Sequence, residues 1–133
     1  MPSVAVDTHA IVWYLANDVR LSSRAADAMD LATAAGDAIH VPSICLVELT
    51  YLVEKGRLPR IARERLIEAL DDPDAACTLA PLDRAVADAL ESIDRAKVPD
   101  LPDRVVTATA IALQVPLISR DGKIQTSRVQ IIW

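Results

Sequence analysis

Five short apolar runs divide this sequence, and segments with helical spacing of their apolar residues separate them. None of the runs alternates polar and apolar residues, as a strand with one face in water would. Uninterrupted apolar runs of this length are typical of strands buried on both faces, with helices as crossovers between parallel neighbours. We therefore predict a three-layer α/β/α sandwich with a mainly parallel central sheet. The predicted strands are residues 4–6, 39–41, 76–79, 116–119 and 129–132.

Helices are predicted between these strands, over residues 9–16, 23–34, 43–55, 60–70, 84–96 and 103–114. Gly36 and Gly56 stand where the second and third of these helices should end. Residues 44–53 are apolar on nearly every side, so we expect the third helix to be buried all round. Side chains that favour N-caps precede three of the helices: Ser22 or Ser23, Ser43 and Asp83.

Length and composition predict one folded domain, residues 1–133. The net charge of −5 argues against a protein that grips duplex nucleic acid by bulk charge, although a metal site can supply positive charge locally. Cys45 and Cys77 are too few for a disulfide framework or a cysteine-rich zinc site. The N-terminus does not read as a signal peptide, and no uncharged stretch is long enough to span a membrane. We therefore expect a cytoplasmic protein that does not use a membrane.

Two aspartates follow predicted strands. Asp7 ends the first apolar run, and Asp121 comes shortly after residues 116–118. Because the carboxyl ends of parallel strands meet at one edge of a sheet, where ligands bind, both side chains are candidates for a site there. The alternative is that each of them only caps or forms the turn that follows, since Asp favours such positions.

Glu48 lies within the third predicted helix and shares a face with apolar residues such as Cys45 and Leu52. An ionised carboxylate in such surroundings is costly unless it is paired or bound to a metal. Glu48 is therefore a candidate metal ligand, and the alternative is an ion pair with an arginine that the fold brings to it.

Asp103 begins the last predicted helix, and simple N-capping would account for an aspartate there. Asp100, three residues earlier, is a similar candidate, which would be either the true cap or a supporting group.

Together these four acids, Asp7, Glu48, Asp103 and Asp121, favour one interpretation. Carboxylates gathered within several ångströms repel one another, and a divalent cation between them reverses that penalty. Oxygen ligands without His or Cys select a hard ion, Mg²⁺ or Mn²⁺, rather than zinc. Such a site is best suited to phosphoryl or phosphodiester displacement, in which the metal activates a water and neutralises charge on phosphate oxygens.

The four acids and their surroundings resemble the PIN domain and, more narrowly, the VapC toxins of bacterial and archaeal toxin–antitoxin pairs. The resemblance covers the whole chain in order: Asp7 within VAVDTHAIVW, Glu48 within VPSICLVELTYLV, Asp103 within PDRVVTATAIAL, and Asp121 within VPLISRDGKI. It implies a PIN-like α/β/α fold, magnesium-dependent endoribonuclease activity, a homodimer, and a small cognate antitoxin that blocks the site.

Carried over by position, the resemblance implies that Asp7, Glu48 and Asp103 hold the principal metal and that Asp121 completes the acidic pocket. The nucleophile would be a water, and Thr8 and Ser119, beside matched acids, would orient ligands or water. Pro102 departs from the family, because many relatives have an aromatic or other apolar residue there; this leaves open whether Asp100 shares the metal-facing role. Basic residues near the motifs are either a path for RNA phosphates or ordinary solvated charges: Arg104, Arg120, Lys123 and Arg128.

Three rival functions have weaker support. A phosphatase of the haloacid dehalogenase type needs a second aspartate where this chain has His9. A receiver domain of two-component signalling has a similar size and an acidic magnesium pocket, but needs a lysine after a late strand, which the three lysines do not match well. A catalytically silent PIN module that only binds antitoxin or RNA is the third rival. His9 and His40 belong to no ligand-spaced pair, which favours a bystander role for both.

Overall fold

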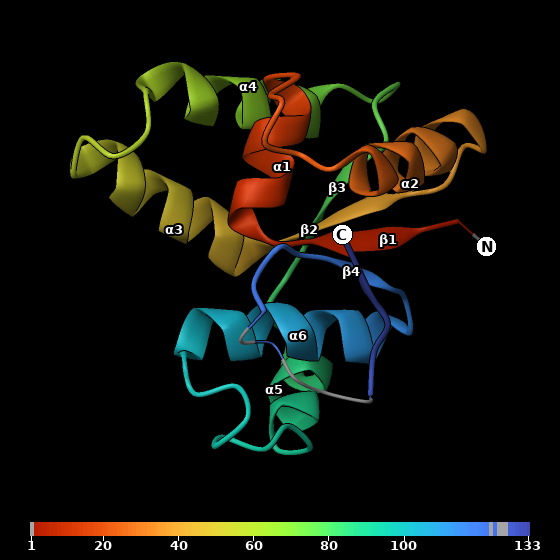
Figure 1. The fold of residues 1–133 in the computed structure, drawn as a ribbon, viewed down its shortest axis with the longest axis vertical. Helices are drawn as coiled ribbons and strands as arrows, with labels where there is room; N and C mark the ends of the chain where they lie inside the picture. The colour runs from red at the N-terminus through yellow and green to blue at the C-terminus, as the bar shows by residue number, and fades with distance from the viewer. Residues whose placement is uncertain (1, 123, 125–127) are drawn as a thin grey trace.

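A parallel sheet forms the centre of the computed structural model, which describes residues 2–122, 124 and 128–133. Helices α1 to α4 lie on one side of the sheet, and α5 and α6 lie on the other (Figure 1). The predicted three-layer α/β/α sandwich is thus confirmed. In the described part of the chain the strands are β1 (Val4–Val6), β2 (Ile39–Pro42), β3 (Cys77–Ala80), β4 (Leu117–Ile118) and β5 (Ile131–Ile132). The helices are α1 (Thr8–Leu15), α2 (Ser23–Ala34), α3 (Ser43–Glu54), α4 (Arg60–Asp71), α5 (Arg84–Leu90) and α6 (Leu101–Leu113).

The order of the strands places a switch point beside β1. The sheet runs β3-β2-β1-β4-β5, and every pairing in it is parallel. The chain therefore builds outward from β1 to β3, and returns to the other side of β1 with β4 and β5. At such a point the connections leave adjacent strands in opposite directions, which opens a crevice outside their carboxyl ends. The residues that follow β1 and β4 lie at this crevice.

The core lies where the middle strands meet the helices. Val6, Leu117 and Ile118 have no exposed surface, as expected for strands covered on both faces. Aliphatic residues and alanine form most of the buried set, and Trp13 of α1 is the one aromatic residue in it among those described. No helix in the described residues has the length and apolar character that crossing a membrane requires.

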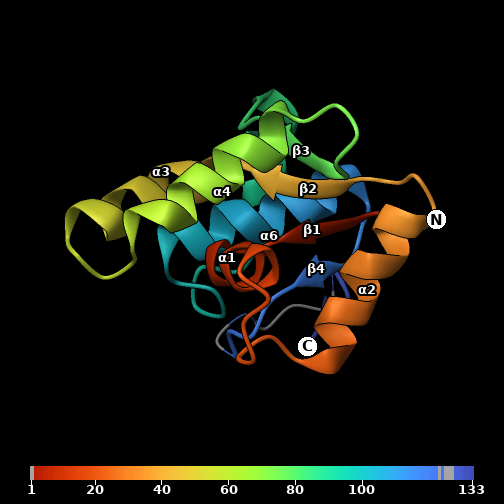
Figure 2. The same ribbon diagram turned by 90° about the horizontal axis from the view of Figure 1, so that it is seen from above.

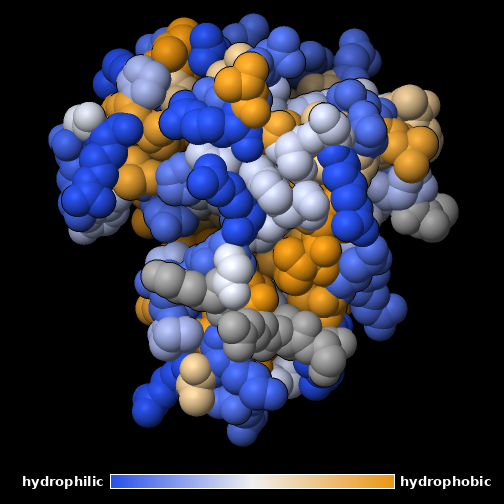
Figure 3. All heavy atoms as spheres, in the orientation of Figure 1, coloured by the Kyte–Doolittle hydropathy of each residue, from blue (hydrophilic) through white to orange (hydrophobic). Residues whose placement is uncertain are grey.

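Helix α3 is more exposed than predicted. Only Cys45 and Leu49 are buried along it, whereas Val47 and Tyr51 are 55% and 59% exposed. The helix extends beyond the carboxyl edge of the sheet (Figure 2), so part of its surface has no neighbouring layer to pack against. Apolar side chains consequently lie among polar ones on the surface over α3 and α4 (Figure 3). The expectation of a helix buried all round is therefore wrong.

The predicted caps are partly confirmed. Ser22 caps α2 and Asp83 caps α5, each accepting a backbone N–H from three residues ahead. Ser43 is not a cap, because Pro42 occupies that position and the Ser43 hydroxyl instead accepts the N–H of Leu82 at 3.1 Å. This bond ties the start of α3 to the chain that leaves β3.

Helix α5 is shorter than predicted, ending at Leu90 rather than near residue 96. The side chains of Ser92 and Asp94 bond to nearby backbone groups, Ser92 to the carbonyl of Ala89 and Asp94 to the N–H of Ala96. Such local bonds compete with continuation of a helix.

Replacing Leu117 by alanine tests the position of the core. Its side chain is fully buried in β4, so Leu117→Ala should lower the free energy of unfolding by about 2–5 kcal/mol. Leu31→Ala is the matched control, because Leu31 is 61% exposed and its removal should change stability by less than about 0.5 kcal/mol. Urea denaturation followed by circular dichroism measures both, and equal losses would contradict the assigned burial.

Candidate functional site

A cleft of about 590 Å³ opens at the carboxyl edge of the sheet, between α1, α3, α6 and the loop after β4. All four predicted acids line it, from four separate stretches of the chain. Asp100 lines it as well, at the start of α6. The structure therefore brings the predicted site residues to one place: Asp7, Glu48, Asp103 and Asp121.

Asp7 joins β1 to α1. One carboxylate oxygen accepts the N–H of Ala10 at 2.9 Å, and the other accepts the hydroxyl of Ser119 at 2.6 Å. Asp7 is therefore the N-cap of α1, as the simpler interpretation required, but each oxygen keeps a further lone pair. Burial raises the pKa of Asp7, while the bonds from Ser119 and Ala10 partly oppose that rise. These two bonds orient the Asp7 carboxyl group at the end of β1.

Glu48 is held by a hydroxyl. The Thr8 side chain, which is buried, donates to a carboxylate oxygen of Glu48 at 2.5 Å. No salt bridge to Glu48 occurs among the residues the structure describes, so the arginine partner considered as an alternative is not found there. Thr8 therefore links the start of α1 to the middle of α3 and fixes the Glu48 carboxylate at the cleft.

Asp103 occupies the first turn of α6 without capping it. The cap is Asp100, whose carboxylate accepts the N–H of Asp103 at 3.2 Å. The N-cap role considered for Asp103 is therefore wrong, and the same role for Asp100 is confirmed. Burial, a hydrogen bond with the Asp121 carboxyl and the neighbouring negative charges raise the pKa of Asp103 to about 7. Desolvation and the nearby carboxylates therefore favour the protonated form of Asp103.

Ser119 connects the acids on the two middle strands. It is buried, its hydroxyl donates to Asp7, and it accepts the backbone N–H of Asp121 at 3.1 Å. The chain that leaves β4 is thus locked to the end of β1 by one side chain. The predicted orienting role of Thr8 and Ser119 corresponds to these bonds to Glu48 and Asp7.

The donor atoms in the cleft fit a hard divalent cation. Carboxylate oxygens dominate it, and the pKa values of Asp7 and Asp103 are raised, so deprotonation here needs a compensating positive charge. Within residues 2–122, 124 and 128–133, no three His, Cys, Asp or Glu side chains already form a compact metal cluster. The thiol of Cys45 lies beneath the acids, but burial raises its pKa and keeps it protonated, which disfavours metal binding.

The basic residues singled out in the sequence lie in different places. Arg104 is not on a path to the cleft, because its guanidinium donates to the carbonyls of Leu90 and Ile93 and anchors the chain after α5. Arg120 does line the cleft. Arg128 lines a separate hollow beside α6 and β5, and Lys123 lies outside the described residues.

Sequence reasoning missed Trp13 and regarded His9 as a bystander, yet both line the cleft. The two residues are four apart on α1, and their rings lie 5.5 Å from each other. That spacing places two residues on the same face of a helix, and Asp7 at its start is a further indication that the face looks toward the site. The four-residue spacing of His9 and Trp13 was therefore the sequence signal that could have placed both residues at the site.

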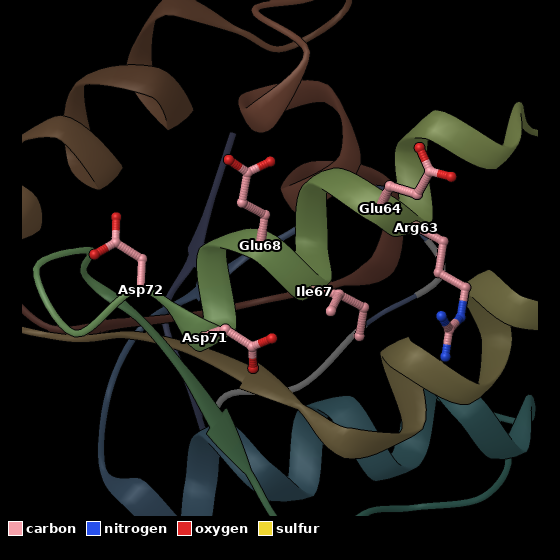
Figure 4. A pocket seen from close by; sticks show the side chains of 6 residues that line it. All are labelled: Arg63, Glu64, Ile67, Glu68, Asp71 and Asp72. Carbon is pink, nitrogen blue, oxygen red and sulfur yellow. The ribbon is translucent and has the colours of Figure 1, made fainter.

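A second hollow of about 600 Å³ lies along α4 and is also acidic (Figure 4). Glu64, Glu68 and Asp72 point to one side of the helix, and Asp71 points to the other. On that other side Arg63 donates to the Thr50 hydroxyl of α3 at 3.1 Å. These acids are exposed and do not converge, so we assign the chemistry to the cleft at the sheet edge.

The raised pKa of Asp103 predicts how the free energy of unfolding depends on pH. Asp103 holds a proton in the folded state up to about pH 7, whereas the unfolded chain releases it near pH 3.8. The folded state therefore binds more protons across this window, and its stability should fall as the pH rises through it. Solvent screens a half-buried group, so we expect a loss of about 1–2 kcal/mol between roughly pH 5 and pH 8 in EDTA.

Asp103→Asn is the control for this prediction, because an amide has no proton to release. Urea denaturation at a series of pH values should show a weaker decline for Asp103→Asn than for the parent chain. Equal pH dependence in the two proteins would contradict the raised pKa of Asp103.

The chain is similar to known proteins in its sequence profile and in its fold. A sequence profile of the PIN domain matches residues 4–129. No curated protein matches the chain in sequence. Among solved structures, a chain in the crystal structure of VapBC2 from Rickettsia felis bound to a DNA fragment from the promoter is similar in fold. It has 15% identity and a TM-score of 0.71, over 97% of this chain and 96% of that one.

Two further structures have the same fold. A chain of a toxin–antitoxin complex from Klebsiella pneumoniae has 18% identity and a TM-score of 0.66, over 98% of this chain and 96% of that one. A chain of FitAcB from Neisseria gonorrhoeae has 21% identity and a TM-score of 0.64, over 96% and 95% respectively. Similarity at these identities establishes the fold alone, whereas the profile match spans nearly the whole sequence. The chain therefore belongs to the PIN domain family.

Proposed function

We propose that this chain is a Mg²⁺-dependent endoribonuclease and the toxin of a toxin–antitoxin pair. The observation that carries the proposal is the cleft at the sheet edge, where four acids from separate stretches lie together in a PIN domain. PIN domains are generally nucleases, which agrees with a site rich in carboxylates and lacking a nucleophilic triad. Solved structures of similar fold come from toxin–antitoxin complexes, which supports a cognate antitoxin as partner.

Asp7, Glu48 and Asp103 would hold the cation, and Asp121 would complete the pocket, with Mn²⁺ as a possible substitute for Mg²⁺. When bound, the cation supplies activation of a water and neutralisation of charge on the phosphate oxygens. The chain supplies the positioning: Ser119 fixes one oxygen of Asp7, and Thr8 fixes one oxygen of Glu48. The proton that the raised pKa keeps on Asp103 must leave before this carboxylate is charged.

The rival functions have less support in the cleft. A receiver domain needs a lysine beside its acidic pocket, and among the described residues none lines this cleft. A silent PIN module needs no intact set of acids, whereas here Asp7 and Glu48 are each oriented by a dedicated hydroxyl. A homodimer, which the family resemblance implies, and the cytoplasmic location expected from the sequence remain part of the proposal.

Asp7→Asn tests the nuclease directly. The amide preserves the volume and can still cap α1, but it removes a charged ligand, so cleavage of single-stranded RNA should fall by at least about 100-fold. The measurement is gel analysis of a labelled RNA incubated with purified protein and Mg²⁺. Asp27→Asn on the exposed face of α2 is the matched control and should cut RNA at the parent rate.

Cleavage that persists in EDTA would contradict the metal dependence, and full activity of Asp7→Asn with the melting temperature unchanged would contradict the metal-binding role of Asp7. The second result would leave Asp7 as a helix cap alone.

Metal binding is tested without relying on activity. Because the cation relieves repulsion between carboxylates in the folded state, millimolar Mg²⁺ should raise the melting temperature of the parent chain. The shift should be small or absent in Asp7→Asn and should persist in Asp27→Asn. Differential scanning calorimetry with and without EDTA measures it, and an equal shift in all three proteins would indicate binding elsewhere.

A further inference from the structure

One wall of the cleft differs in charge from the rest. Five acids line the cleft, and a phosphodiester that approaches them is repelled unless positive charge lies nearby. Arg120 is the only Lys or Arg that lines the cleft within the part of the chain that the structure describes. It follows β4 and lies over Trp13 of α1, and His9 of the same helix also lines the cleft. This wall is where the chain itself can meet an anionic strand.

Trp13 holds the Arg120 guanidinium in place. The guanidinium carbon lies 5.6 Å from the centre of the indole ring, within the range of a cation–π interaction. Trp13 is only 7% exposed and packs edge-on against Trp133 at 5.9 Å, so the ring is a fixed support. Its indole N–H has no hydrogen-bond partner among the described residues. Trp13 therefore supports Arg120 through the face of its ring.

Arg20 provides an internal comparison. Its guanidinium carbon lies 5.2 Å from the same indole ring, but two hydrogen bonds at 2.7 and 3.0 Å join it to the Asp18 carboxylate. The positive charge of Arg20 is therefore paired with the Asp18 carboxylate, and Arg20 does not line the cleft. Arg120 forms no salt bridge within the described residues, so its donors remain available for a phosphate.

His9 adds an exposed ring to this wall. It stands in the first turn of α1, lines the cleft, and lies 5.5 Å from Trp13 at a tilt of 51°. Unpaired bases of single-stranded RNA stack on exposed aromatic rings, histidine included. A guanidinium and an exposed ring that both lie near Trp13 match the phosphate and the base of one nucleotide.

We propose that His9 and Arg120, supported by Trp13, form a subsite for the nucleotide next to the bond that is cut. Arg120 contacts its phosphate, and the His9 ring stacks on its base. This inference rests on the proposed function, because it specifies how a single-stranded RNA enters the same cleft. It explains how a chain with a net charge of −5 holds RNA without a broad basic surface.

The experiment measures binding in an Asp7→Asn background, where RNA is not consumed. Fluorescence anisotropy of a labelled single-stranded RNA, with Mg²⁺ present, gives Kd at a series of salt concentrations. Arg120→Gln should weaken binding several-fold and reduce the slope of log Kd against log salt by about 0.7, the value for one lost phosphate contact. Arg120→Lys should restore the slope because the charge returns.

Arg20→Gln is the matched control and should leave both the affinity and the slope unchanged. His9→Ala should weaken binding by about fivefold with the slope unchanged, since stacking releases no counterions. In the chain with Asp7 intact, Arg120→Gln should raise KM for RNA cleavage more than it lowers kcat, which is the signature of lost substrate binding.

The outcomes separate the two proposals. If the parent chain cuts RNA but Arg120→Gln and Arg20→Gln have the same affinity and slope, the subsite is wrong and the nuclease stands. If the parent chain neither binds nor cuts RNA, both proposals fail. If Arg120→Gln lowers the melting temperature of the Asp7→Asn protein, the His9→Ala variant decides. Unchanged RNA affinity of His9→Ala overturns the subsite. Weaker binding of His9→Ala with the salt slope unchanged supports it.

Discussion

Repulsion between carboxylates at the carboxyl edge of a parallel sheet is the constraint on which this structure depends. Parallel pairing of β1 with β4 brings Asp7 and Asp121 to the same edge, and α3 and α6 add Glu48 and Asp103. The fold relieves part of that repulsion with the hydroxyl donors Thr8 and Ser119 and with the raised pKa of Asp103. What remains favours a divalent cation, and this preference is the physical origin of the proposed chemistry.

Much of the fold could be predicted from the sequence, because strands covered on both faces leave uninterrupted apolar runs. The edge position of Asp7 and Asp121 followed from the same reasoning. The exposure of α3 could not be predicted, because it depends on how far the helix extends past the sheet. The start of α6 was misplaced because two aspartates compete for the cap. Pro102 suits the first turn of a helix, and it was the feature that favoured Asp100 as the cap.

Residues at the cleft wall were harder to predict than the acids. A buried strand that ends in an acid is visible in one dimension, whereas the contact between Arg120 and Trp13 joins segments more than a hundred residues apart. Arg104 shows the converse, since a charge next to a site residue in sequence can be directed to backbone carbonyls at and just beyond the end of α5. Charge near a motif is thus weak evidence until the fold shows where it points.

The site draws its side chains from nearly the full length of the chain, with Asp7 close to one end and Asp121 close to the other. Ser119 joins these ends, so the bonds that orient Asp7 form only after the late strand has docked. Folding of the whole sheet is therefore a precondition for the site, which no single segment of the chain can form by itself.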